Sequence, residues 1–108
     1  MSILGFGDMM KQMTKLQAKM DEMKRKLEAL EVEGESGGGM VKVIMNGRND
    51  VLAITIEPGI VSADNVVMLQ DLIKSALEQA RAKAQEAQAE ALSEITGGIP
   101  IPGLSLPF

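Results

Sequence analysis

The chain is almost devoid of the side chains that enzymes use for acid–base or nucleophilic chemistry. Its 108 residues include no His and no Cys, so it has no imidazole base, no thiolate nucleophile and no nitrogen- or sulfur-ligated metal site. The serines lack a histidine partner, and Lys74 and Ser75, as sequence neighbours on a helix, point to different sides. We therefore expect no enzymatic activity, no catalytic residue, no cofactor and no small-molecule substrate.

Two further patterns resemble ligand sites only at first sight. The glycines of residues 34–39 have the spacing of a phosphate-binding loop, but residues 40 and 41 are Met and Val instead of the Lys and the hydroxyl residue that such a loop needs. Glu86, Glu90 and Glu94 recur every four residues, which predicts an acidic stripe on one face of a helix. Without a turn or mixed oxygen ligands, we interpret this stripe as a solvated surface and not as a metal site.

Basic side chains are concentrated near the start of the sequence. Residues 1–26 contain six cations and three acids, a net charge of +3, whereas the remainder contains five cations and twelve acids, a net charge of −7. The total of −4 argues mildly against nucleic-acid binding, but its distribution places a basic helix on an acidic body. The six cations are Lys11, Lys15, Lys19, Lys24, Arg25 and Lys26.

Four of these cations form a row. Lys11, Lys15, Lys19 and Lys26 are separated by 4, 4 and 7 residues, so they line one side of a helix, whereas the other two cations fall elsewhere around it. A row of lysines with little compensating acid indicates either a binding site for a polyanion or an ordinary solvated face. The residues alone leave these two readings open.

The helix that would position this row follows from the apolar pattern. Seven apolar residues recur at spacings of 4, 3, 4, 3, 4 and 3, a heptad seam that predicts one helix about 33 Å long. Asp8 is expected to be its N-cap, or at least a favourable charge at its positive end. In a parallel coil of two such helices Lys19 and Lys24 would repel, so we expect the seam to pack against the second helix instead. The seam residues are Met9, Met13, Leu16, Met20, Met23, Leu27 and Leu30.

Three strands are expected after this helix. A glycine-rich turn at residues 37–39 should join the first two strands and should adopt backbone angles closed to other residues. Asn46-Gly47 is typical of the turn between two antiparallel strands. The strands predicted from the β-branched, partly alternating pattern are residues 32–36, 40–45 and 51–56, and they form a three-stranded antiparallel meander.

A second helix is expected from Ser62 or Asp64 to the Gly97-Gly98 pair. Its apolar face shrinks from Leu and Ile to Ala along its length, so small side chains could receive the Met-rich seam of the first helix. Residues 99–108 are too rich in Pro and Gly for regular structure, and we expect either a mobile tail or an extended arm laid on a neighbour. The sequence thus predicts one domain at residues 1–98 and a tail at residues 99–108.

Size and composition favour a homodimer. A chain of 108 residues leaves much of its apolar surface uncovered as a monomer. The only aromatic residues are Phe6 and Phe108, and the nine Met give a soft core. The start of the sequence lacks the features of a signal peptide, and no apolar run approaches the roughly 18–20 residues of a membrane span. We expect a protein of a reducing cytosol that is not associated with membranes.

The sequence LEVEGESGGGMVKVIMNG at residues 30–47 resembles the signature of the YbaB/EbfC family of bacterial nucleoid-associated proteins. The Met-, Gln- and Lys-rich first helix is similar to that of the family, as are ITIEP at residues 54–58, LQDLI at residues 69–73 and the ending from Pro102 to Phe108. The resemblance covers essentially the whole chain.

The resemblance implies an α+β fold of a long helix, a three-stranded antiparallel meander and a long helix, α-β-β-β-α, in a homodimer with projecting helices. It also implies binding of duplex DNA, with little or member-dependent sequence preference, in the cytoplasm and nucleoid. The acidic stripe of the second helix argues against DNA contact there. Transferred by region and charge, the family's DNA-binding role falls on Lys11, Lys15, Lys19, Lys24, Arg25 and Lys26.

Two other functions are compatible with the same residues. A helical protein-interaction module would use the exposed part of the Met-rich first helix to bind partner helices, and its basic row would be incidental. The first helix could also lie on an anionic membrane surface, although the chain has no Trp or Tyr and Phe6 is expected to precede the helix. The low net charge favours the protein module, and the resemblance favours DNA.

Overall fold

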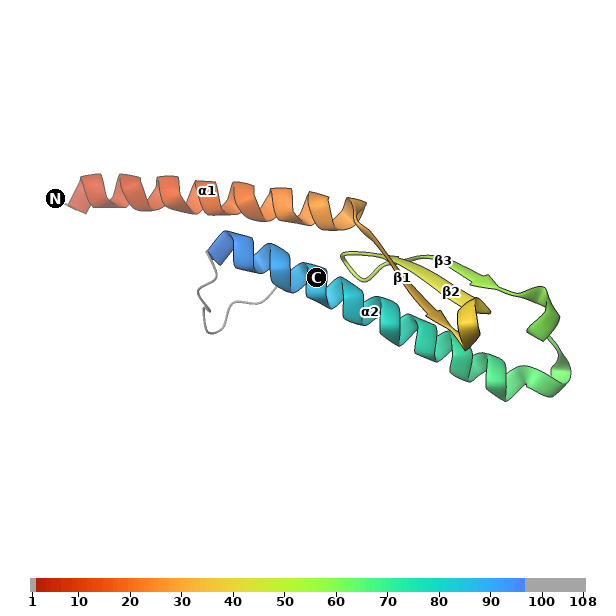
Figure 1. Ribbon diagram of the computed structural model, residues 1–108. Helices are drawn as coiled ribbons and strands as arrows, with labels where there is room; N and C mark the ends of the chain where they lie inside the picture. The colour runs from red at the N-terminus through yellow and green to blue at the C-terminus, as the bar shows by residue number, and fades with distance from the viewer. Residues whose placement is uncertain (1, 97–108) are drawn as a thin grey trace.

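The computed structural model of this protein describes the backbone of residues 2–96 and the side chains of residues 5–95. The molecule is elongated, 74 × 23 × 18 Å, because two long helices run side by side and extend beyond one end of a small sheet (Figure 1). The expected tail at residues 99–108 lies outside the described residues. The helices and strands are α1 (Ser2–Ala29), β1 (Glu31–Ser36), β2 (Val41–Asn46), β3 (Val51–Ile56) and α2 (Val66–Thr96).

The sheet confirms the expected meander. Its strands are antiparallel in the order β1-β2-β3, and Val43 in the middle strand lies opposite Gly34 on one side and Ile54 on the other. The turn between β1 and β2 is the glycine run Gly37–Gly39, whose φ angles are 61°, 67° and 95°. Glycine adopts such angles without the strain that a β-carbon adds, so the expectation for this turn is also confirmed.

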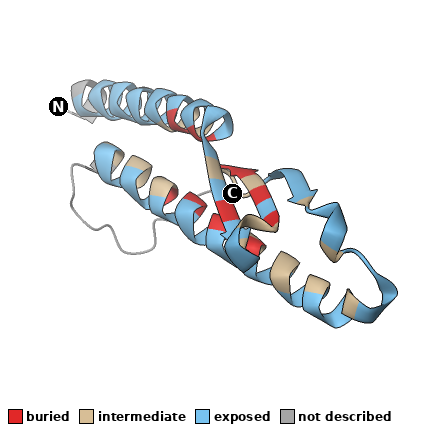
Figure 2. Cartoon of the chain, turned by 45° about the vertical axis from the view of Figure 1, so that its right-hand side comes forward, coloured by how far each residue is buried: buried red, intermediate tan, exposed pale blue. Residues whose placement is uncertain are grey.

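The core lies between the sheet and the small face of α2. Val41, Val43 and Met45 of β2 point toward α2 and are at most 1% exposed, and the alanines beneath them are completely buried. The buried residues gather where α2 crosses β1 and β2 (Figure 2). The expectation that the small face of α2 receives the Met-rich seam of α1 holds only near the end of α2, where Ala91 and Met23 line one hollow. The alanines earlier on that face pack against the sheet instead: Ala76, Ala80 and Ala84.

Gly34 allows α2 to approach the sheet this closely. A β-carbon on Gly34 would lie 2.1 Å from the carbonyl oxygen of Ala76 and 2.6 Å from the amide nitrogen of Ala80. Both neighbours are helix backbone atoms, which cannot rotate away as a side chain can. The strand and the helix thus touch backbone to backbone at this point.

The first helix begins earlier than the sequence indicates. It starts at Ser2, so Asp8 lies inside the helix and is not its N-cap, and Phe6 lies on the helix instead of preceding it. One glycine costs a helix only about 1 kcal/mol, so Gly5 and Gly7 do not end it. The second helix, α2, begins at Val66 and not at Ser62 or Asp64. Ser62 has an extended backbone before a 3-10 turn that precedes α2, and its side chain makes no capping hydrogen bond.

The apolar seam of α1 packs against α2 over only part of its length. Met23 and Leu27 are 4% and 3% exposed, but Met9, Met13 and Leu16 are 60%, 66% and 47% exposed. The reason is geometric, because α1 continues past the end of α2 (Figure 1). The expectation of a seam packed against the second helix is right near the sheet and wrong further out.

Replacing Gly34 with Ala should destabilise the fold by about 2–3 kcal/mol, because the added methyl group forces α2 away from the sheet. Urea denaturation would measure this loss. Gly59→Ala is the control, since a β-carbon at Gly59 has no neighbour within 4 Å and should change stability by less than about 0.5 kcal/mol. Equal denaturation midpoints for the two variants would contradict this packing.

Candidate nucleic-acid interface

The C-terminal end of α1 is attached to the rest of the molecule at Gly47, in the turn between β2 and β3. The amide of Gly47 donates to the carbonyl oxygens of Leu27 (2.7 Å) and Leu30 (3.1 Å) at the end of α1. The buried side chain of Gln88 in α2 donates to the carbonyl oxygen of Gly47 (2.8 Å). This junction ties the end of α1, the turn and the middle of α2 together.

Side chains of the turn make this junction rigid. The Oδ1 atom of buried Asn46 accepts hydrogen bonds from the amides of Arg48 (2.9 Å) and Asp50 (3.0 Å), and its Nδ2 atom donates to the Asp50 carboxylate (3.0 Å). The Arg48 guanidinium pairs with Glu28 in the last turns of α1. These residues set the direction in which α1 projects, and sequence reasoning recognised only the turn among them.

All six sequence-predicted site residues lie on α1, and five of them are exposed, whereas Lys24 is half-buried. With 3.6 residues per turn, the row of Lys11, Lys15, Lys19 and Lys26 lies about a third of a turn away from the apolar seam. Lys24 falls on the other side of the seam, and Arg25 falls outside the row. The structure thus brings four of the six cations together on one side of α1.

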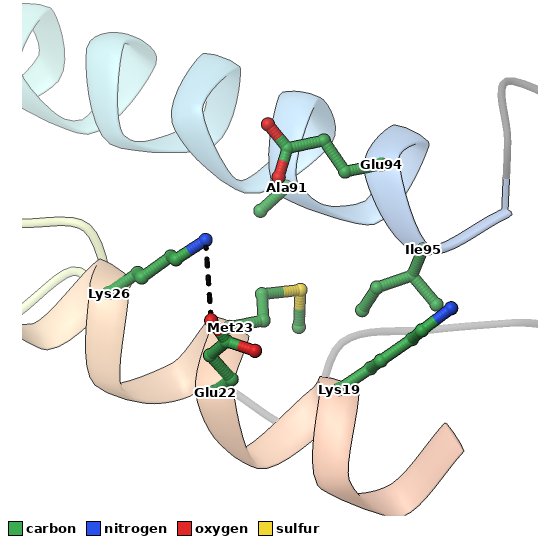
Figure 3. A pocket seen from close by; sticks show the side chains of 7 residues that line it. All are labelled: Lys19, Glu22, Met23, Lys26, Ala91, Glu94 and Ile95. Atoms are coloured by element: carbon green, nitrogen blue, oxygen red, sulfur yellow. Dashed lines mark ion pairs between the residues drawn. The ribbon is translucent and has the colours of Figure 1, made fainter. Parts of the chain in front are cut away.

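Acidic side chains accompany the row near the body of the protein. The ammonium group of Lys26 lies 3.7 Å from a carboxylate oxygen of Glu22, and both side chains are more than 60% exposed, so this pair contributes little stability. Lys19 and Lys26 also line a hollow of about 160 Å³ between α1 and α2, together with Glu22 and Glu94 (Figure 3). Lys26 is therefore partly neutralised, whereas Lys19 lies near carboxylates without an ion pair among the described contacts.

The outer part of the row is more strongly positive. Lys15 has Lys11, Gln12, Ala18 and Lys19 at the positions three and four residues away, so no acidic side chain neighbours it on the helix surface. Asp8, three residues before Lys11, lowers the positive charge at the outer end. The strongest positive potential is therefore expected around Lys15, on the part of α1 that projects past α2.

Within residues 2–96, no group of three or more His, Cys, Asp or Glu is placed to hold a metal ion, and Glu86, Glu90 and Glu94 are exposed. No helix in that part of the chain is long and apolar enough to cross a membrane.

Comparison with known proteins decides the family. Residues 1–99 match the sequence model of the YbaB/EbfC DNA-binding family. The chain belongs to this family. The family's description names DNA binding and no catalytic activity, and the resemblance seen in the sequence is confirmed.

Curated relatives agree with this YbaB/EbfC assignment, and one solved structure shares the fold. A nucleoid-associated protein of Gluconacetobacter diazotrophicus is 44% identical over 101 residues, which cover 93% of this chain and 94% of the relative. One from Dictyoglomus thermophilum is 44% identical over 93 residues, 86% of this chain and 89% of the relative. The crystal structure of an uncharacterized Helicobacter pylori protein, 20% identical, matches 85% of this chain and 97% of that one with a TM-score of 0.78, which supports the fold.

In this YbaB/EbfC chain, Gln88→Leu should cost about 1–3 kcal/mol, because the buried carbonyl of Gly47 loses its donor. Amide hydrogen exchange should also accelerate in the last turns of α1, which the junction holds. Gln85→Leu is the matched control, since Gln85 is exposed on the same helix. If both variants kept the stability and exchange rates of the unmodified chain, the junction would not hold α1.

Proposed function

We propose that this chain is a nucleoid-associated protein that binds duplex DNA as a homodimer, in the cytoplasm, through the basic row of α1. The observation that carries the proposal is the row of exposed lysines on a helix that projects from an acidic body. Family membership and relatives named as nucleoid-associated proteins support it. Lys11, Lys15 and Lys19 are the principal contacts, and Lys24, Arg25 and Lys26 are nearer the body.

The chemistry of such contacts sets the character of the binding. Lysine ammonium groups neutralise phosphates and release condensed counterions, and phosphate contacts carry no sequence information directly. Phe6 is the one aromatic side chain in the described residues, so stacking on unpaired bases adds little. The acidic remainder of the chain repels DNA and confines contact to α1. Duplex should therefore be preferred over single strands, with a shallow sequence preference.

The second copy in this proposal binds at β3. The outer edge of β1 is already occupied by α2, since the amide of Glu35 donates to Gln79 Oε1 (2.6 Å) and Lys83 Nζ donates to the carbonyl oxygen of Glu33 (2.7 Å). The outer edge of β3 is uncharged, and an exposed apolar edge strand invites pairing with another strand. Its large exposed apolar residues are Val51, Leu52 and Ile54.

The flank of α2 on the β3 side extends this apolar surface. Ile54 lies opposite buried Val43 and so faces the α2 side of the sheet, but α2 packs on β1 and β2 and leaves Ile54 46% exposed. Ile73 and Leu77 lie on the flank of α2 away from Gln79, where they line a groove of about 400 Å³. A second copy joined at β3 would cover both surfaces and double the basic row to eight lysines.

Changing Lys15, Lys19 and Lys26 together to Glu should abolish DNA binding and leave the dimer intact, because none of them lies on the apolar seam or on β3. For the unmodified protein, about four to six phosphate contacts from eight lysines give a slope near −4 to −5 in a plot of log affinity against log salt. Mobility-shift titrations of a duplex at several salt concentrations measure both quantities.

A comparison of two single variants, Lys15→Glu and Lys42→Glu, separates the effect of position from the effect of net charge. Lys42→Glu changes the charge as much as Lys15→Glu but lies on the polar face of the sheet opposite Thr55, so only Lys15→Glu should weaken binding markedly. A triple mutant that remains dimeric and shifts DNA with the same salt slope would place the binding surface elsewhere.

Ile54→Glu should convert the dimer into monomers, because a carboxylate would be buried unpaired between two copies. Thr55→Glu is the matched control, since Thr55 is the next residue of β3 and faces the opposite side of the sheet. Light scattering should give a mass near 11.5 kDa for the Ile54 variant and twice that for the control. Equal masses for the two variants would refute the β3 interface.

A further inference from the structure

The turn that holds the end of α1 contains a chemically reactive dipeptide. Asparagine is a labile residue, and Asn46 precedes Gly47, whose lack of a β-carbon leaves its amide nitrogen open to attack the side chain before it. In that reaction the glycine amide loses its proton and its nitrogen attacks Cγ of the asparagine. The N–Cγ bond forms, the Cγ–Nδ2 bond breaks, and the side-chain nitrogen takes up a proton and leaves as ammonia. Water then opens the cyclic imide to aspartate or isoaspartate, with no change of oxidation state.

The packing of the turn requires both residues of this dipeptide. A β-carbon on Gly47 would lie 2.7 Å from the carbonyl oxygen of Leu27 and 3.0 Å from its α-carbon, so a bulkier, less reactive residue does not fit. The buried side chain of Asn46 accepts hydrogen bonds from the amides of Arg48 and Asp50 and donates one to the Asp50 carboxylate. An apolar side chain there would leave these groups without partners.

The docked end of α1 blocks the attacking atom. Gly47 is buried, and its amide donates to the carbonyl oxygens of Leu27 (2.7 Å) and Leu30 (3.1 Å). Removing the amide proton would break both hydrogen bonds and place an anionic nitrogen against two carbonyl oxygens. The hydrogen bonds of the Asn46 side chain also hold its carboxamide in one orientation. The reaction therefore requires Gly47 to separate from α1.

We propose that Asn46 is a deamidation site that the end of α1 protects, and that release of α1 from Gly47 starts its conversion. The product makes this release permanent. In an aspartate, a carboxylate oxygen replaces the Nδ2 atom that lies 3.0 Å from the Asp50 carboxylate, and like charges repel. An isoaspartate lengthens the backbone before Gly47 by a methylene group and moves its amide and carbonyl away from their partners on α1 and α2. A local opening thus becomes an irreversible loss of the junction that directs α1.

The test is the rate at which Asn46 converts in the full chain at mildly alkaline pH, followed by peptide mass spectrometry. The folded chain should convert Asn46 about tenfold or more slowly than the same chain unfolded in urea, because the reaction waits for a local opening. Chromatography of the peptides separates the aspartate and isoaspartate products from the unmodified peptide. Equal rates in the folded and the unfolded chain would overturn the proposal.

Two variants identify the opening that exposes the site. Gln88→Leu removes the donor to the Gly47 carbonyl and should accelerate conversion several-fold in the folded chain, whereas Gln85→Leu, exposed on the same helix, should not. The faster rate should change little at low urea concentrations, because separation of α1 exposes little surface, whereas global unfolding depends steeply on urea. Equal rates in the two variants, or a rate in the Gln88 variant that rises in step with global unfolding, would overturn the proposal.

Asn46→Asp reproduces one product directly and should accelerate amide hydrogen exchange in the last turns of α1. Asn65→Asp is the matched control, since Asn65 lies beyond the other end of β3, where its Nδ2 atom donates to the carbonyl oxygen of Ile60 (3.3 Å). Unchanged exchange in the Asn46 variant would contradict the permanent release. DNA binding enters none of these measurements, so their outcome is independent of the proposed function.

Discussion

The backbone contact between β1 and α2 at Gly34 is the constraint on which the rest of the structure depends. Because no β-carbon stands between the strand and the helix, the alanine face of α2 reaches the buried side chains of β2. The same close packing brings Gln79 and Lys83 within hydrogen-bonding distance of the outer edge of β1. It also allows Gln88 to donate a hydrogen bond to the carbonyl oxygen of Gly47. A side chain at position 34 would loosen all of these contacts together.

The close contact between β1 and α2 also accounts for the two surfaces that the proposed function uses. The narrow alanine face lets α2 cover β1 and β2 but not β3, which leaves uncovered the apolar edge with which the proposed second copy would pair. At the other end, the Gly47 junction holds α1 so that its basic row projects past α2. In the proposed function, the acidic remainder of the chain repels DNA and the basic row of α1 attracts it.

The sequence predicts the order of elements because each has a local signal: the heptad seam, the positive-φ glycine run and the Asn46-Gly47 turn. It does not predict how far α2 extends along α1, since heptad spacing identifies the apolar face of a helix but not the length of its neighbour. The same limit applies to the site. The row of lysines is visible from spacing, whereas the placement of Glu94 and Lys19 on opposite sides of one hollow depends on tertiary packing. The sequence did contain a signal for Gln88, because it is a polar residue in line with the buried alanines of α2. Its hydrogen-bond partner, the carbonyl of Gly47, could not be inferred from the sequence.

The central claim is that DNA contacts the outer part of α1 and not the sheet or α2. A titration of the isotopically labelled dimer with a short duplex, followed by NMR chemical shifts of backbone amides, tests it most directly. The account predicts that salt-reversible shifts concentrate at residues 11–26, with the largest around Lys15, while amides of the core such as Val43 and Ala80 stay unchanged. Shifts concentrated on β3 or on α2, with α1 unaffected, would contradict it.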